Sequence, residues 1–246
     1  MKNERNLLKL LTDDECAIAF REALDNANKH IESSSLIACS GQYGMAISHL
    51  ILSTEETVKG LLLYLQSIKV EIRNVPGMYL YFTDHTIRHQ LAMQINLMYG
   101  IIKPFMELAL SMKDCLHQPD KKISLKETTL VVMSQYEKKA DAYVKELEEM
   151  FDWWEDTNEM KNKGLYVDYT TRLETPMQIE EAKYLKSSKL ILDFENKVFE
   201  IISYLEKLNK EQKIEFAYLA NANNLQSIFQ KFTEARKTQR KQEINN

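Results

Sequence analysis

The stretch TDDECAIAFREALDNANKHI, residues 12–31, has the pattern of an amphipathic α-helix that begins after Thr12. Thr12 and Glu15 have the spacing of a capping box, in which each side chain accepts a hydrogen bond from an otherwise unpaired N–H of the first turn. Apolar residues then recur at three- and four-residue spacing, at Cys16, Ala19, Phe20, Ala23, Leu24, Ala27 and Ile31. This pattern predicts a helix to about residue 38, with Gly41 near its end.

The same periodicity continues along the chain and predicts an all-α fold. The expected helices cover about 43–70, 83–112, 124–163, 175–205 and 211–236. Gly164 is expected to end the third of these as its C′ residue, and residues 165–169 are expected to be extended. Six Gly and four Pro are too few for an all-β fold with many turns. We expect a main domain over residues 1–210 and a C-terminal helical extension with a polar basic tail over 211–246.

Composition limits the class of protein. The formal net charge is −4, so no global positive field attracts nucleic acid, and any RNA contact must come from a local patch. Cys16, Cys39 and Cys115 have no metal-ligand spacing and are expected to be reduced thiols, as in the cytosol. No signal peptide is recognised at the N-terminus, and no apolar run reaches membrane-spanning length. We therefore expect a cytoplasmic protein with no membrane contact.

The segment Thr83-Asp84-His85-Thr86-Ile87-Arg88-His89 carries the strongest signal for chemistry. His85, Arg88 and His89 share one helix face near a helix start, where free N–H groups favour an anion. An imidazole can move a proton near neutral pH, and a guanidinium can hold a phosphate. The alternative is a solvated polar face beside Asp84.

Two other segments supply charged groups. Glu55 and Lys59 are expected to form a surface ion pair, while Glu56, one position further round the helix, is expected to point inward toward an Arg or Lys of another helix. Lys161 and Asn162 precede the short segment that contains Tyr166 and Asp168. The alternative for the basic residues there is an ordinary helix C-terminal cap.

Familiar enzyme motifs are missing from the sequence. It contains no Walker A loop, no dinucleotide-binding glycine motif, no His-Glu-x-x-His and no Cys-x-x-Cys. We expect no metal and no cofactor.

Three segments together resemble the AbiV family of the HEPN superfamily. They are residues 41–50 (GQYGMAISHL) with Glu55-Glu56-x-x-Lys59, then Phe82-x-x-His85-x-x-Arg88, and then Lys163-Gly164-Leu165-Tyr166-Val167-Asp168 with Thr175-Pro176. The resemblance covers about residues 13–205. It implies a HEPN-like antiparallel helical bundle, a homodimer, and a metal-independent ribonuclease that arrests growth on phage infection. RNA would be the substrate, and a phage-encoded protein is a possible activator.

The usual HEPN signature, an Arg followed by a His after four to six residues, is not present at any of the seven arginines. The nearest match is Lys161-Asn162-x-x-x-Tyr166. By resemblance, a composite site would use His85, Arg88, Lys161 and Tyr166 for catalysis. Glu56, Lys59, His89, Asn162 and Asp168 would bind RNA or support these groups. The alternative function is a non-catalytic helical dimer that sequesters a phage or host protein.

Overall fold

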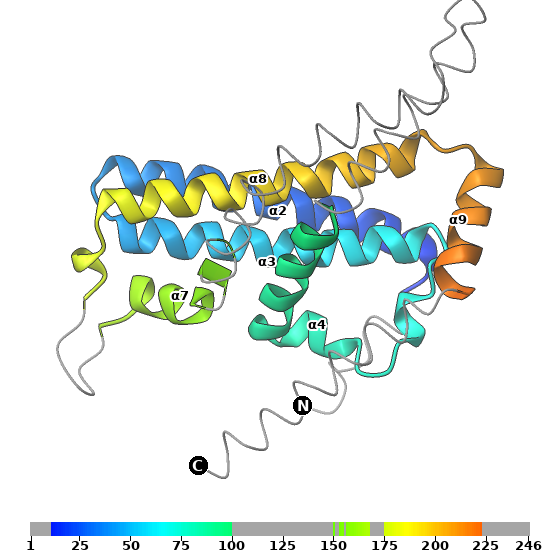
Figure 1. Ribbon diagram of the computed structural model, residues 1–246, viewed down its shortest axis with the longest axis horizontal. Helices are drawn as coiled ribbons and strands as arrows, with labels where there is room; N and C mark the ends of the chain where they lie inside the picture. Colours follow the sequence, from blue (N-terminus) through cyan, green and yellow to red (C-terminus); the bar gives the residue numbers. More distant parts are fainter. Residues whose placement is uncertain (1–10, 100–149, 151–152, 155, 168–174, 223–246) are drawn as a thin grey trace, which may run out of the picture. The chain divides into compact units, whose positions relative to one another are not determined.

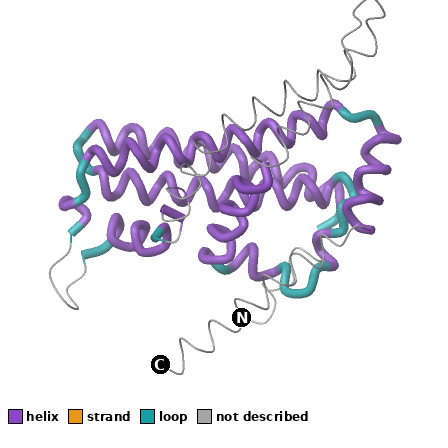
Figure 2. Tube along the Cα trace, in the orientation of Figure 1, coloured by secondary structure: helices purple, strands orange, loops and turns teal. Residues whose placement is uncertain are grey.

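The computed structural model describes residues 11–99, 150, 153–154, 156–167 and 175–222. The chain forms two compact units, one of residues 1–92 and 156–246 and the other of residues 93–155. The described part is helical with connecting loops and contains no strand, which confirms the all-α prediction (Figure 2). The helices expected between residues 100 and 149 lie outside the described ranges. The division expected near residue 210 remains a prediction.

In the first unit, α2 (Asp13–Cys39) and α3 (Tyr43–Ser67) form a helical hairpin (Figure 1). The capping box of α2 is formed as predicted: Thr12 N–H donates to Glu15 Oε2 at 2.7 Å, and Glu15 N–H donates to Thr12 Oγ1 at 3.2 Å. Gly41 joins the two helices with a φ of +77°, a conformation that glycine adopts without a steric penalty.

α3 is the central helix of this unit. α2, α7 (Thr157–Leu165) and α8 (Glu181–Lys207) all pack against it, so that it is buried around most of its circumference. Its partly exposed stripe contains Met45, His49, Leu52, Glu56 and Lys59. The polar side chains of Ser48, Ser53, Thr54, Glu55 and Thr57, on the other faces of α3, are inside the protein.

The chain then turns through η2 (Ile72–Asn74) and the short α4 (Tyr79–Thr83), which was not predicted. The next helix begins at residue 85 and is described to residue 99. After α8, α9 (Lys210–Ala222) returns to the end of α3, where the Asn221 side chain accepts from Glu71 N–H and donates to Lys69 O.

Two local predictions were wrong. Gly164 is not a C′ residue: it lies inside α7, is buried, and Tyr166 is the C-cap. The expected helix start at Thr175 is a single turn, η3 (Pro176–Gln178), in which Thr175 N–H donates to Gln178 Oε1 at 3.2 Å. Ile179 and Glu180 are extended, and α8 begins only at Glu181.

Candidate functional site

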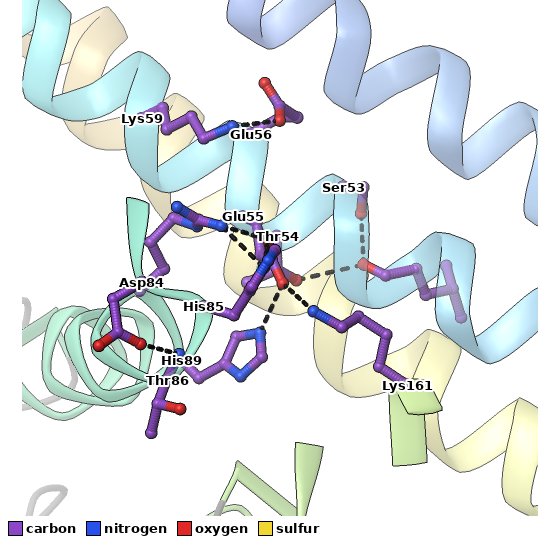
Figure 3. Close-up of polar contacts among 12 residues, drawn as sticks. Ser53, Thr54, Glu55, Glu56, Lys59, Asp84, His85, Thr86, His89 and Lys161 are labelled. Carbon is purple, nitrogen blue, oxygen red and sulfur yellow. Dashed lines mark hydrogen bonds and ion pairs between the residues drawn. The ribbon is translucent and has the colours of Figure 1, made fainter. Parts of the chain in front are cut away.

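A buried carboxylate, Glu55, is the centre of the candidate site. It lies on the same face of α3 as Ile51, Val58 and Leu62, and its side chain is 2% exposed. Four basic side chains surround it and, with Glu55, form what we name the Glu55 cluster: His85, Arg88, His89 and Lys161 (Figure 3). A buried carboxylate requires such partners, because removal from water strongly disfavours an unpaired charge.

The helix that begins at residue 85 supplies three of the four basic groups. Its N-terminus is capped by Asp84, whose Oδ1 accepts from Thr86 N–H at 3.0 Å. The anion site expected there is thus already occupied by a carboxylate of the chain. His85, Arg88 and His89 share one face as predicted, and this face is turned toward Glu55. It is not a solvated face, because Arg88 and His89 are buried.

The contacts divide between the two carboxylate oxygens. Glu55 Oε2 lies 2.5 Å from His85 Nδ1 and 2.6 Å from Arg88 Nη2. Glu55 Oε1 lies 3.1 Å from His89 Nε2 and 3.0 Å from Lys161 Nζ. Lys161 comes from α7, 106 residues further along the chain, and is also buried. The helix that begins at residue 85 thus engages both oxygens, and α7 adds a second partner to Oε1.

These partners keep Glu55 ionised. Burial alone would raise its pKa, but the hydrogen bond from His89, together with the charge and hydrogen bond of Arg88, holds the pKa well below its usual range. Burial lowers the pKa of His89 despite the neighbouring carboxylate. His89 is therefore neutral near pH 7 and donates its Nε2–H to Glu55.

His85 is the member of the cluster that reaches the surface, with a side chain 50% exposed. Its Nδ1 lies 2.5 Å from Glu55 Oε2 and 2.8 Å from Arg88 Nη2. Because a carboxylate can only accept, the short contact with Glu55 is a hydrogen bond in the tautomer that carries the proton on Nδ1. In the neutral ring the other nitrogen, Nε2, then has the lone pair and can accept a proton. In this tautomer Glu55 orients the His85 ring, as a carboxylate does for the histidine of a catalytic triad.

The roles of Glu55 and Glu56 are the reverse of those predicted. Glu56 does not point inward: it accepts from Lys59 Nζ at 2.6 Å on the partly exposed stripe of α3. One residue corresponds to about 100° around a helix, and this rotation places Glu55 in the interior. Glu56 and Lys59 therefore form the surface pair, three residues apart, and contribute no group to the Glu55 cluster.

The remaining predicted residues lie near the end of α7. Tyr166 and Asn162 are exposed, Tyr166 to 64%, and among the described residues no hydrogen bond connects either side chain with the Glu55 cluster. Asp168 lies outside the described residues. The structure thus brings together His85, Arg88, His89 and Lys161, but not Tyr166 or Asn162.

The main residue missed by sequence reasoning is Glu55. A signal was available, because Ile51, Glu55, Val58 and Leu62 are spaced as one helix face, and a lone carboxylate among three apolar residues suggests a buried charge. Among the described residues, no three His, Cys, Asp or Glu side chains are arranged to hold a metal ion. The described helices also include none with the length and apolar character needed to span a membrane.

In a comparison with protein families, residues 15–192 match the model of the HEPN family described as AbiV. The match covers well over half of the chain and includes every member of the Glu55 cluster. No curated protein and no solved structure matches the chain.

Proposed function

Since the chain belongs to the AbiV family of HEPN-type abortive-infection proteins, we propose that it arrests growth after phage infection by cleaving RNA at the Glu55 cluster. The observation that carries the proposal is the half-exposed imidazole of His85, held through Nδ1 by a buried, ionised carboxylate. This is the arrangement of a general base with a defined tautomer.

In the proposed reaction, His85 Nε2 accepts the proton of an RNA 2′-hydroxyl. The 2′-oxygen attacks the adjacent phosphorus, the bond from phosphorus to the 5′-oxygen breaks, and that oxygen takes a proton from protonated His85 or from water. The products are a 2′,3′-cyclic phosphate and a 5′-hydroxyl. No metal enters this scheme, because the nucleophile belongs to the substrate.

The other residues receive different roles. Arg88, His89 and Lys161 are buried and contact Glu55, which favours a role in holding the carboxylate ionised over the direct phosphate contact expected for Arg88 and Lys161. Tyr166 and Asn162 are exposed and lie close in sequence to Lys161, the member of the Glu55 cluster on α7. They are proposed to contact the RNA chain. The functional unit is proposed to be a homodimer, with a phage-encoded protein as its activator.

The test compares His85→Ala with His49→Ala. His49 is a half-buried histidine on α3 whose ring contacts His30 and is not part of the Glu55 cluster, so it controls for the loss of an imidazole. His85→Ala is expected to lower RNA cleavage by about a hundredfold or more, in line with general acid–base contributions. The cleaved ends are expected to carry the cyclic phosphate. Equal cleavage by the two variants would contradict the proposal.

One observation favours the alternative, a helical dimer that sequesters a phage or host protein. Four of the five members of the Glu55 cluster are buried and form ion pairs or hydrogen bonds with one another, as in a structural polar core. If His85→Ala arrests growth as fully as the parent protein, the binding role is preferred.

A further inference from the structure

α7 and α3 are in direct backbone contact at one point. A Cβ on Gly164 of α7 would lie 2.2 Å from the carbonyl oxygen of Gly44 and 2.2 Å from Ser48 Oγ, both on α3. These distances are far below van der Waals contact, so no side chain fits between the helices at this position. Glycine is required here for close approach, since Gly164 lies in regular helix and has no positive φ.

A hydrogen bond joins the helices beside this contact. Ser48 is completely buried, and its hydroxyl oxygen lies 2.9 Å from Lys161 O and 3.1 Å from Gly44 O. The Ser48 hydroxyl therefore connects α3 to α7 at Lys161, the residue whose amine contacts Glu55. We name Gly44, Ser48 and Gly164 the α3–α7 seat.

The seat and the Glu55 cluster lie on the same helix faces. On α3, Ser48 precedes Glu55 by seven residues, or two turns, so both project toward α7 and its neighbours. On α7, Lys161 precedes Gly164 by three residues and shares its face. The distance between the two backbones at the seat therefore sets how far the Lys161 amine must reach to lie 3.0 Å from Glu55 Oε1.

We propose that Gly164 and Ser48 are positioning residues of the Glu55 cluster. They hold α7 close to α3 in the register that delivers the Lys161 amine to Glu55 and keeps water away from this ion pair. That Gly164 and Ser48 support RNA cleavage rests on the proposed ribonuclease function. That they position the Lys161 amine does not.

The test variant is Gly164→Ala. Ordinary contact begins near 3.4 Å, so the added Cβ at 2.2 Å requires a displacement of about 1 Å, and backbone at Gly44 cannot rotate away. The matched control is Gly60→Ala, because Gly60 is likewise a buried helical glycine, on α3. Its Cβ would meet mainly the side chain of Leu24 on α2, at 2.8 Å, and would perturb the α2–α3 contact without touching α7.

The first readout is labelling of lysine amines in the folded protein with an acylating reagent, followed by peptide mass spectrometry. Lys163 is an internal reference on α7, because its side chain is 38% exposed while that of Lys161 is 8% exposed. In the parent and in Gly60→Ala, the acylation rate of Lys161 should be lower than that of Lys163 by a factor of about ten or more. In Gly164→Ala, the two rates should approach one another.

The second readout is RNA cleavage. A misplacement near 1 Å can lower a rate by about a hundredfold, so Gly164→Ala should reduce kcat by about tenfold to a hundredfold with a smaller change in KM. Ser48→Ala, which adds no bulk, should change both readouts in the same direction and serves if Gly164→Ala does not fold. Continued protection of Lys161 in the folded variants, or exposure of Lys161 with unchanged cleavage, would overturn the proposal. If the parent cleaves no RNA, the ribonuclease function fails and labelling alone decides the role of the seat.

Discussion

Glu195 is a buried acid that the proposed reaction does not use, and its replacement should change how stability depends on pH. It lies on α8 with 3% exposure and faces α3, where Thr57 Oγ1 donates to its Oε1 at 3.4 Å. Among the described residues, no Lys, Arg or His forms an ion pair with it. Burial raises the pKa of Glu195 to about 7, and the hydrogen bonds with Ser53 and Thr57 offset only part of this increase.

The size of the effect follows from linkage. The ordinary value is 4.5, so between pH 4.5 and about 7 the unfolded chain carries an ionised Glu195 while the folded protein carries a neutral one. The folded state then binds more protons, and its stability falls as the pH rises through this window. At about 1.4 kcal/mol per pH unit, the full loss is about 3 kcal/mol, complete above the folded pKa.

The perturbation is Glu195→Gln, which resembles the neutral acid and cannot ionise. The free energy of unfolding of the variant and of the parent would be measured by urea denaturation, followed by circular dichroism, at several pH values. The difference in the free energy of unfolding, variant minus parent, should increase by about 2.5 kcal/mol between pH 5 and pH 8.5. Titration of His30, His49 and His89 affects both proteins and cancels in the difference.

Glu206→Gln is the control, because Glu206 is an exposed acid on the same helix. This variant controls for the loss of one acidic side chain from α8. If the difference in the free energy of unfolding between Glu195→Gln and the parent stays constant from pH 5 to pH 8.5, Glu195 ionises normally in the folded protein. That result would refute the reasoning from its burial and from its hydrogen bonds with the Ser53 and Thr57 hydroxyls.

Three other outcomes are expected. Glu55→Gln should lower the free energy of unfolding at pH 7 by about 3 kcal/mol or more, because buried cations lose their counter-charge; urea denaturation measures this, and an unchanged midpoint would contradict it. Simultaneous replacement of Cys16, Cys39 and Cys115 by Ala should leave growth arrest intact, and loss of arrest in a folded variant would show that a thiol matters. Light scattering at micromolar concentration should give about twice the 28.8 kDa chain mass, and a value near the chain mass would exclude the dimer.

Local interactions explain what the sequence predicted well. The start of α2 depends on Thr12 and Glu15, three residues apart, and it forms as expected. The common face of His85, Arg88 and His89 follows from helical spacing alone. Each of these features involves neighbours within about one helical turn, so no knowledge of distant segments was needed.

Which side chains of α3 face the interior could not be predicted from local spacing in the same way. Periodicity identifies a buried face when the opposite face is polar, but α3 is covered by helices on several sides and is apolar around most of its surface. Glu55 and Glu56 are adjacent in sequence. The spacing of Glu55 with apolar residues indicated burial, but the helices packed around α3 supplied the partners that make it possible.

The sequence by itself determined that this chain is helical, where α2 and α3 begin, and which residues share the face that carries His85 and Arg88. Only the tertiary structure decided that this face meets Glu55, that Lys161 joins it from 106 residues away, and that Gly164 permits close packing instead of ending a helix. The physical reason is that secondary structure depends on backbone and side-chain contacts within a few residues. A buried charge cluster depends instead on the mutual packing of helices that are distant in the chain.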